Sequence, residues 1–342
     1  MPLATQLENF RERVETFIRL ETSAPVAIDQ VIPLPGGASR DTWLIMGTID
    51  NEPTHLVLRR DLETEMVEQA LTREQEFRLI KAAFESGVRV PRPRWYATDS
   101  AVLGKPFFVM DYVEGVSIGP KVIRDPDLAT ARKRLPEQLA QELATIHAID
   151  IHTHELNFLD APTAGQSPSH KAVQDTRHAV EKLNINNPAL EYGLRWCEQN
   201  APDCDAITVI HGDFRIGNLL VGPEGLTAVI DWEFSRVGDP AEDLAWPTVR
   251  DWRFGNGQLK LGGFGDREPF IAHYEQVSQR TIDRKAVDFW EILGNLRWAT
   301  TCIQQADRHL SGGDPSVEFA SLGRRSAEMQ LEMLRLIKAW KD

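Results

Sequence analysis

One short stretch of this 342-residue chain constrains its fold more than any other. It reads HGDFRIGN over residues 211–218 and places Asp213 and Asn218 five positions apart. Two short apolar runs follow, and they flank the turn-forming sequence GPEG at 222–225. Pro and Gly between two β-prone runs predict a hairpin. The residue Asp231 stands directly after its second strand, so the hairpin would bring Asp231 close to Asn218.

These three residues have the types and the order that phosphoryl transfer needs. The spacing of Asp213 and Asn218 is that of the Asp and the Asn in a kinase catalytic loop. An amide and a carboxylate can hold Mg²⁺ on nucleotide phosphates, which assigns the metal to Asn218 and Asp231. Asp213 is then the group that receives the proton of an acceptor hydroxyl. Because the three residues and the hairpin occur together, this interpretation outweighs that of His-Gly-Asp as an ordinary turn.

On these motifs the chain resembles the aminoglycoside phosphotransferase/choline kinase group of small-molecule kinases, which are relatives of the protein kinases. In that group the catalytic loop reads HGD…N, and the metal-binding Asp lies in an IDWE-like stretch, here at 230–233. The resemblance implies an α+β, protein-kinase-like fold of two lobes. Residues 1–114 would form a nucleotide-binding lobe with an antiparallel sheet and one main helix. Residues 115–342 would form a mostly helical catalytic and acceptor-binding lobe. ATP or GTP and Mg²⁺ are the implied cofactors.

A basic residue and an acidic residue in the first lobe are expected to fix the nucleotide. The predicted third strand ends in Arg59, where most kinases carry a phosphate-contacting lysine. A guanidinium keeps its charge and can engage phosphate through two hydrogen bonds. Arg60 is the competing assignment, although strand alternation turns it to the opposite face. In the helix predicted at 72–86, the resemblance assigns Glu76 as the partner of the strand cation, with Glu74 as the alternative.

Two further segments of this lobe are expected to contact the nucleotide. A Gly-rich turn between two apolar runs predicts a hairpin whose backbone amides at Gly36, Gly37 and Ser39 could cover the phosphates. The turn lacks a full G-x-G-x-x-G, so a plain turn is the alternative. A later strand resembles the hinge that hydrogen-bonds adenine through its backbone, and Met110 and Tyr112 carry that assignment. A buried strand without ligand contact is the alternative.

The remaining candidates lie near the acceptor. Arg215 could steady the neighbouring catalytic carboxylate or approach the transferred phosphoryl group, and packing on the loop is an equal alternative. Helices near the C-terminus help form the acceptor pocket in the family, which makes Trp290, Arg297 and Trp298 candidates together with Glu233 of the IDWE stretch. Ordinary packing would explain at least half of them.

Several other polar residues are expected to have structural roles. Asp239 precedes a proline and is predicted to cap a helix. Asp243 resembles a carboxylate that braces the catalytic loop in relatives, and His147 is predicted to be a packed core histidine. Residues 152–174 lack a clear period and predict a long irregular segment.

Composition excludes some functions without selecting one. The net charge of −13 disfavours nucleic-acid binding, which depends on basic patches. No apolar run approaches the roughly 20 residues that a membrane span needs, and the first residues lack a secretory pattern. Three cysteines without a C-x-x-C pair argue against a disulfide framework. We therefore expect a cytoplasmic protein without membrane or nucleic-acid partners, while its oligomeric state is not indicated.

The sequence thus predicts an ATP-dependent phosphotransferase that acts on a hydroxyl of a small molecule. An aminoglycoside pocket should present several carboxylates. An anionic acceptor would instead suit four arginines of the last third of the chain, for which surface ion pairs are the simpler account: Arg297, Arg308, Arg324 and Arg325. Residues 298–313 and 319–336 also resemble the kinase domains linked to acyl-CoA dehydrogenases. An anionic hydroxyacyl or CoA-linked acceptor is therefore one alternative. A nucleotide-binding regulatory module without transfer activity is the other, suggested by Arg59 in place of lysine.

Overall fold

The structure is a computed structural model that describes residues 3–34, 40–61, 70–98, 100–204, 206–312 and 316–340. The chain divides into two compact units. The smaller unit comprises Met1–Gly115, His152–Phe158 and Thr227–Phe234. The larger unit comprises Val116–Ile151, Leu159–Leu226 and Ser235–Asp342.

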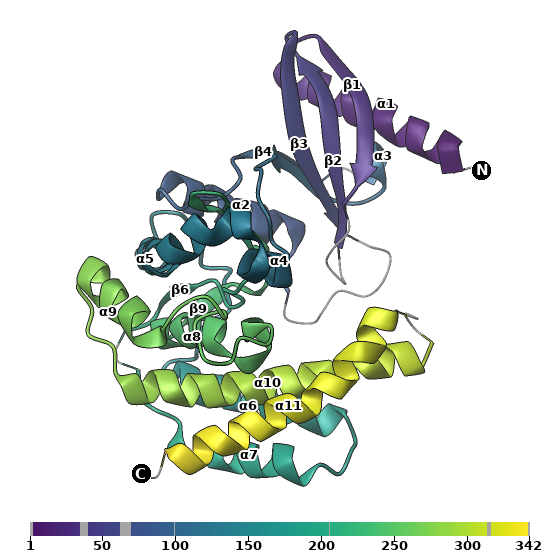
Figure 1. Ribbon diagram of the computed structural model, residues 1–342. Helices are drawn as coiled ribbons and strands as arrows, with labels where there is room; N and C mark the ends of the chain where they lie inside the picture. Colours follow the sequence, from purple (N-terminus) through teal and green to yellow (C-terminus); the bar gives the residue numbers. More distant parts are fainter. Residues whose placement is uncertain are drawn as a thin grey trace. The chain divides into compact units, whose positions relative to one another are not determined.

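A five-stranded antiparallel sheet forms the centre of the smaller unit, with its strands in the order β1-β2-β3-β5-β4 (Figure 1). The strands are β1 (Val26–Pro33), β2 (Arg40–Ile49), β3 (Glu52–Asp61), β4 (Pro93–Ala97) and β5 (Phe107–Asp111). A two-residue turn joins β2 to β3, and in it Asp50 and Asn51 have φ angles of 53° and 64°. Tight hairpins favour this left-handed conformation, and Asp and Asn tolerate it. The predicted antiparallel sheet is confirmed.

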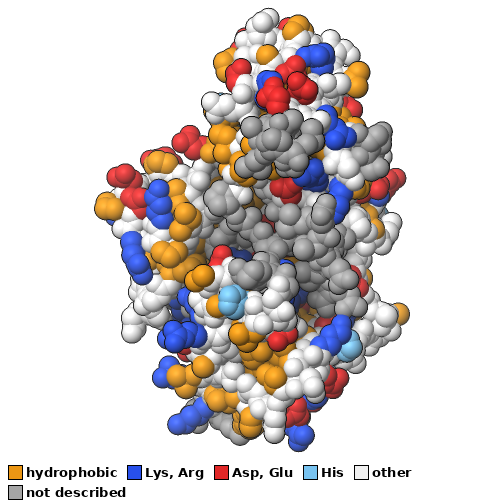
Figure 2. Space-filling view, turned by 90° about the vertical axis from the view of Figure 1, so that its right-hand side faces the viewer, with side chains coloured by type: hydrophobic (Ala, Val, Ile, Leu, Met, Phe, Trp, Pro, Cys, Tyr) orange, Lys and Arg blue, Asp and Glu red, His pale blue; other side chains and the backbone are white. Residues whose placement is uncertain are grey.

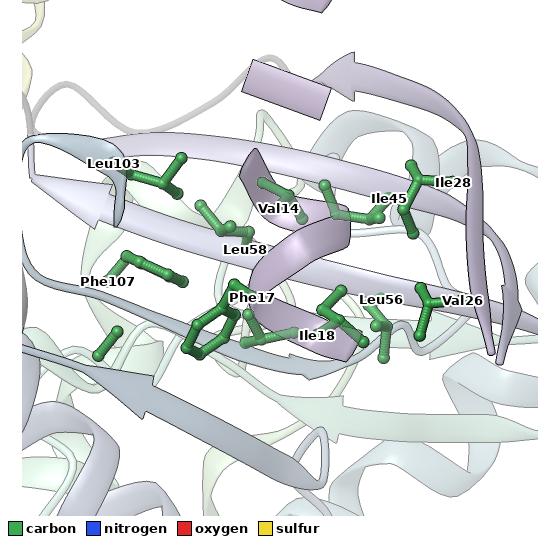
Figure 3. Close-up of a cluster of buried hydrophobic side chains, with 12 residues drawn as sticks. Val14, Phe17, Ile18, Val26, Ile28, Ile45, Leu56, Leu58, Leu103 and Phe107 are labelled. Carbon is green, nitrogen blue, oxygen red and sulfur yellow. The ribbon is translucent and has the colours of Figure 1, made fainter. Parts of the chain in front are cut away.

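One face of the sheet is covered by the first helix. The helices of the smaller unit are α1 (Leu3–Thr22), α2 (Arg73–Glu85) and α3 (Ser100–Leu103). Figure 3 shows Phe17 and Ile18 of α1 among Leu58 and Phe107 of the sheet, and all four side chains are buried. Burying each such side chain stabilises a fold by about 1.5–3 kcal/mol. This apolar layer keeps β3 and its arginine in a fixed position.

The larger unit is mainly helical, as predicted. Its helices are α4 (Gly119–Arg124), α5 (Ala129–Ile146), α6 (Pro168–Lys182), α7 (Pro188–Asn200), α8 (Pro240–Ala245), α9 (Arg267–Ser278), α10 (Arg284–Leu310) and α11 (Val317–Ala339). The short 3₁₀ turns η1 (Pro126–Leu128), η3 (Trp246–Thr248) and η4 (Arg250–Arg253) also belong to it. The two last helices, α10 and α11, lie side by side in Figure 1.

Short strands carry the motifs. Strands β6 (Thr208–Ile210) and β9 (Arg236–Gly238) pair with each other, and β7 (Leu219–Gly222) pairs with β8 (Gly225–Val229). The latter pair is the predicted hairpin, which is therefore confirmed. The turn η2 (Trp232–Phe234) follows β8 in the smaller unit.

One expectation about the larger unit is wrong, and one about the smaller unit falls outside the described residues. The irregular segment predicted for 152–174 ends early, because α6 begins at Pro168. Ser167 caps that helix by accepting a hydrogen bond from the backbone N–H of His170, and a proline at the first helical position favours a helix start. Gly36, Gly37 and Ser39 lie outside the described part of the chain.

The surface carries mixed charge. Figure 2 shows basic and acidic side chains interspersed among the described residues of one face. None of the described helices combines the length and the low polarity that crossing a lipid bilayer requires.

Candidate active site

Asp213 lies in the loop between β6 and β7 of the larger unit, and its carboxylate accepts three side-chain hydrogen bonds. Arg215 Nε donates to Asp213 Oδ1 at 3.0 Å, and Trp246 Nε1 donates to the same oxygen at 2.6 Å. Asn218 Nδ2 donates to Asp213 Oδ2 at 2.6 Å. Both carboxylate oxygens of Asp213 are therefore hydrogen-bonded, and the residue is only 8% exposed.

The orientation of the Asn218 amide is determined by its neighbours. Its Nδ2 donates to the backbone carbonyl of Asp213 at 2.9 Å as well as to the carboxylate. Both partners are pure acceptors, so the nitrogen must point toward them. No residue in the described ranges donates to Asn218 Oδ1, which leaves that oxygen as a neutral, hard ligand of the kind Mg²⁺ prefers. The residue thus fits the metal-binding role that the sequence assigns to it.

A buried carboxylate braces the start of this loop. Asp243 of α8 accepts hydrogen bonds from the backbone N–H groups of His211 at 2.7 Å and Gly212 at 2.9 Å. His147 Nε2 lies 3.2 Å from the same carboxylate, and its Nδ1 lies 2.8 Å from the hydroxyl of Tyr274. Burial opposes ionisation, but the hydrogen bonds and the charge of His147 outweigh it and lower the pKa of Asp243. The loop is therefore anchored by an ionised group, and His147 is packed within the larger unit.

The loop and an indole ring fix the conformation of the Arg215 side chain. Its guanidinium lies 4.2 Å from the ring centroid of Trp252, and its Nη1 donates to the carbonyl of Ile216 at 3.1 Å. Gly217 has a φ of 117°, and a Cβ there would lie 2.1 Å from Arg215 Nη1. Glycine is therefore favoured at this position by its backbone angle, and a larger residue would also displace the Arg215 guanidinium. The arginine steadies Asp213 directly, which is one of the two roles considered for it.

A second group of charged residues lies within the smaller unit. Arg59 Nη1 donates to Glu76 Oε1 at 2.8 Å, and Arg59 Nη2 donates to Asp231 Oδ1 at 2.8 Å. Burial opposes the charge, but Glu76 and Asp231 outweigh it and raise the pKa of Arg59, so the guanidinium stays charged. Arg60 turns to the opposite face, where it pairs with Asp41 at 2.5 Å. The structure therefore forms the expected Arg59–Glu76 pair.

Glu76 has a further cationic partner that the sequence did not indicate. The buried side chain of Arg73, one turn earlier on α2, forms an ion pair with Glu76 and a second one with Asp61 at 3.0 Å. Glu76 itself is fully buried. Acidic and basic side chains thus alternate from Asp61 to Asp231, and these ion pairs hold Arg59 in place on β3.

The two proposed metal ligands belong to different parts of the hairpin. Asn218 directly precedes β7 in the larger unit, and Asp231 follows β8 in the smaller unit. Asp231 has a φ of 68°, an unusual conformation for a residue other than glycine and one that often occurs at functional sites. No group of three or more His, Cys, Asp and Glu ligands occurs among the described residues, so any Mg²⁺ there would also need phosphate or water oxygens.

The segment predicted as the hinge begins on β5, an internal strand of the sheet, and some of its backbone N–H groups already donate hydrogen bonds within the protein. Met110 lies on β5 and is paired with Val57 of β3. The backbone N–H of Tyr112 donates to the carbonyl of His55 at 3.0 Å, and that of Asp111 donates to Arg92. These two N–H groups are already used within the unit. The Tyr112 side chain is 39% exposed.

The candidate acceptor residues separate into distinct places. Trp298 belongs to a group of three indole rings, Trp246, Trp252 and Trp298, which we call the indole cluster, and Arg297 lies beside it. The rings of Trp252 and Trp298 are 4.7 Å apart, and those of Trp246 and Trp252 are 5.8 Å apart. Arg297 lies 5.4 Å from the centroid of Trp246. Because Trp246 bonds to Asp213, this cluster adjoins the catalytic loop.

The other two acceptor candidates make different contacts. Trp290 is 2% exposed and donates to Asp239 Oδ2 at 2.8 Å, while Asp239 caps α8 as predicted. Burial raises the pKa of Asp239, against the effect of the Trp290 hydrogen bond. Glu233 is buried in the smaller unit, where its carbonyl accepts from the N–H of Leu71 at 2.8 Å.

The carboxylates beside the indole cluster are paired with arginine. Glu242 forms ion pairs with Arg236 and with Arg297. Asp251 pairs with Arg325 at 3.1 Å and also accepts a hydrogen bond from Trp298 at 2.6 Å. Burial still raises the pKa of Asp251 against both contacts. The carboxylates of Glu242 and Asp251 are therefore already paired with arginine and are not available to bind a cationic substrate.

The architecture is that of the protein-kinase-like proteins, and comparison with known proteins identifies the family. Residues 30–284 match the model of a family described as the phosphotransferase enzyme family. The chain belongs to this family.

Curated relatives include longer proteins. The chain is 32% identical over 295 residues to acyl-CoA dehydrogenase family member 11 of Homo sapiens, covering 81% of this chain and 37% of that protein. It is 32% identical over 247 residues to member 10 of Mus musculus, covering 69% of this chain and 22% of that protein. The chain thus spans well under half the length of these relatives, and the expected resemblance to this branch is confirmed.

Solved structures share the fold at low identity. A protein provisionally described as an aminoglycoside phosphotransferase, from Ralstonia eutropha, is similar with a TM-score of 0.75 and 21% identity over 96% of this chain and 98% of that one. Choline kinase from Cryptosporidium parvum is similar with a TM-score of 0.63 and 12% identity over 98% of this chain and 95% of that one. The protein-kinase-like fold expected from the sequence is therefore confirmed.

Proposed function

We propose that this protein transfers the γ-phosphoryl group of ATP, or GTP, to a hydroxyl of a small molecule. The observation that carries the proposal is the hydrogen-bonded carboxylate of Asp213, with Asn218 held against it. Membership of the phosphotransferase enzyme family supports the same reaction class. The known chemistry of such transfer needs positioning and charge neutralisation more than covalent help from the protein.

The proposed reaction moves one proton and one phosphoryl group. The acceptor hydroxyl gives its proton to Asp213 as its oxygen bonds to the γ-phosphorus. The bond between that phosphorus and the bridging oxygen breaks, and its electron pair leaves with the nucleoside diphosphate. The proton is later released to solvent, which restores the carboxylate.

The nucleotide and its metal are assigned to residues that the motifs indicate. Arg59, oriented by its pair with Glu76, would bind phosphate oxygens, and it keeps its charge because it is flanked by two carboxylates. Asn218 and Asp231 are assigned to Mg²⁺, which would offset the negative charge of the phosphates when bound. For adenine, Met110 and Tyr112 remain the proposed hinge.

Within this hinge segment, the backbone N–H of the adjoining Val113 is the proposed donor to adenine. Its backbone N–H donates to no described residue, whereas those of Asp111 and Tyr112 are used.

The lobes are assigned functions along the chain. Residues 1–114 would supply most nucleotide contacts, and residues 115–342 the catalytic loop and the acceptor contacts. A cytoplasmic location is also proposed, because three cysteines without a C-x-x-C pair do not form a disulfide framework, which favours a reducing compartment.

For the acceptor, the arginine-paired carboxylates favour a neutral or anionic molecule over a polycation. Arg215 and Arg297 lie over the indole cluster, while Glu242 and Asp251 are already paired. A hydroxyacyl or CoA-linked acceptor is therefore preferred to an aminoglycoside, although similar folds are known in complex with kanamycin and spectinomycin. Trp298 and Arg297 are the acceptor residues that this proposal keeps foremost, ahead of Trp290 and Glu233.

An acceptor panel tests the proposal. The protein would be incubated with MgATP and, in turn, kanamycin, choline and a hydroxyacyl-CoA, and both ADP release and the mass of the acceptor would be followed. We expect at least one acceptor, the hydroxyacyl-CoA first, to gain one phosphoryl group as ADP appears. Tight MgATP binding without ADP release for every acceptor would support a regulatory module instead.

A further inference from the structure

Trp246 makes a contact that neither the motifs nor the proposed function uses. It is the first residue of η3, directly after α8, and its residue is 7% exposed. Its indole Nε1 donates to Asp213 Oδ1 at 2.6 Å, the shorter of the two side-chain hydrogen bonds that this oxygen accepts.

The three donors are distributed unequally over the two oxygens of Asp213. Each carboxylate oxygen has two lone pairs in the carboxylate plane. Oδ1 accepts from both Trp246 and Arg215, so both of its lone pairs are used. Among the described residues, only Asn218 donates a hydrogen bond to Oδ2, which leaves one lone pair for another donor. The carboxylate therefore offers an acceptor hydroxyl one oxygen and not two.

Trp246 suits this task because an indole N–H only donates. It has no lone pair on nitrogen with which to accept the proton, and it does not titrate in the physiological range. A histidine or a carboxyl at the same place could take up a proton and turn away. The N–H thus keeps the same partner throughout the reaction.

The ring is held by its surroundings. Trp252 lies 5.8 Å away between ring centroids, and the guanidinium of Arg297 lies 5.4 Å from the Trp246 centroid. Helix α10 comes close enough that a Cβ on Gly294 would lie 3.4 Å from the Trp246 ring and 2.8 Å from the side chain of Val249. A glycine inside a long helix costs about 1 kcal/mol relative to alanine, so close packing is the physical reason for this one.

We propose that Trp246 is a positioning residue for phosphoryl transfer: with Arg215 it occupies Oδ1 of Asp213 and so directs the acceptor hydroxyl to Oδ2. This inference rests on the proposed function of Asp213. Trp246 itself touches no reacting atom. Its effect should therefore appear in turnover and not in nucleotide binding.

Kinetics of Trp246→Phe test the role. Phenylalanine keeps an aromatic ring and removes only the donor, and the loss of a hydrogen bond to a charged group predicts a kcat about 10- to 100-fold lower. The KM for ATP should stay within about twofold, because the nucleotide contacts are elsewhere. Trp196→Phe is the matched control, since Trp196 is also a buried indole of the larger unit but packs on Phe289 and Trp340. An unchanged kcat in Trp246→Phe would overturn the proposal.

A double-mutant cycle separates positioning from general damage. In the Asp213→Asn background, Trp246→Phe should add less than about a twofold loss, because the carboxylate that it positions is already gone. Full multiplication of the two losses would mean that the indole acts elsewhere and would also overturn the proposal.

NMR spectroscopy tests the hydrogen bond between Trp246 and Asp213 without an activity assay. The chain has nine tryptophans, so ¹⁵N-indole labelling of the whole protein gives nine side-chain N–H signals, and the one lost in Trp246→Phe is assigned. That signal should shift on Asp213→Asn while the others stay, since the charged acceptor is removed. A signal that does not move refutes the hydrogen bond. A wild-type protein inactive on every acceptor would refute the proposed function instead, and the indole signal would still report on the contact.

Discussion

Replacing Glu76 with glutamine is expected to destabilise the smaller unit strongly and to weaken nucleotide binding. Glu76 is a fully buried carboxylate that pairs with Arg59 and with Arg73. Glutamine has nearly the same shape but no charge, so the substitution removes an anion from between two buried cations. Each arginine keeps one other partner, Asp231 for Arg59 and Asp61 for Arg73.

The size of the effect follows from this arrangement. Breaking a buried ion pair by removing one partner costs about 3–5 kcal/mol, because the remaining charge is left uncompensated. Because Arg59 and Arg73 each keep a second carboxylate partner, we expect Glu76→Gln to lower the free energy of unfolding by about 3 kcal/mol, near the lower end of this range. Since 1 kcal/mol moves the unfolding midpoint of a domain of this size class by about 2–4 °C, the midpoint should fall by about 6–12 °C.

Glu74→Gln provides the control. Glu74 lies on the same helix two residues earlier and is exposed, so its substitution should change stability by no more than about 0.5 kcal/mol. Thermal unfolding of the wild type and the two variants would be followed together, with ATP affinity measured by calorimetry. If Glu76→Gln lowered the midpoint no more than Glu74→Gln, the account of the buried charges would be wrong.

Two other substitutions test the metal and the brace of the loop. Asp231→Asn removes a charged oxygen ligand, so calorimetry should show that ATP binding loses most of its dependence on Mg²⁺; an undiminished dependence would remove Asp231 from the metal site. Asp243 has a lowered pKa, so its ionised form contributes stability above the unfolded carboxyl pKa of about 3.9, and that contribution is lost as the pH falls through the lower folded value. The free energy of unfolding, measured with denaturant, should therefore be higher for wild type than for Asp243→Asn. This difference should be constant near about pH 6 and shrink below about pH 4. A difference that grew on acidification would contradict the assignment.

The loop around Asp213 could be predicted because its signal is local, whereas the bracing role of Asp243 followed only from the resemblance to relatives. The spacing of Asp213 and Asn218 and the GPEG turn define a loop and a hairpin by sequence alone, and β7 and β8 confirm the hairpin. Strand alternation correctly separated Arg59 from Arg60, since the two side chains must point to opposite faces.

The contacts that the sequence did not indicate depend on tertiary packing. Arg73 looks like an ordinary first-turn residue of a surface helix, and only the fold brings Asp61 to it and buries it. Trp246 and Trp252 stand in short 3₁₀ turns, where no period marks one face as buried. Their spacing after Asp243 is the one signal that could have pointed to them.

The start of α6 was missed for a different reason. Ser167 and Pro168 together are a recognisable helix start, but the surrounding polar residues obscured the period that follows. The backbone bonds of Asp111 and Tyr112 cannot be seen in a sequence at all, because they depend on the register between strands.

Turnover of Asp213→Asn with an identified acceptor tests the central claim most directly. General-base contributions commonly amount to about 10²- to 10⁴-fold, so turnover at saturating ATP should fall by about that factor. ATP affinity should be nearly unchanged, because Asp213 is assigned to the acceptor and not to the nucleotide, and thermal unfolding would verify that the near-isosteric variant remains folded. Equal turnover of wild type and Asp213→Asn would contradict the account, because it would remove Asp213 from the reaction.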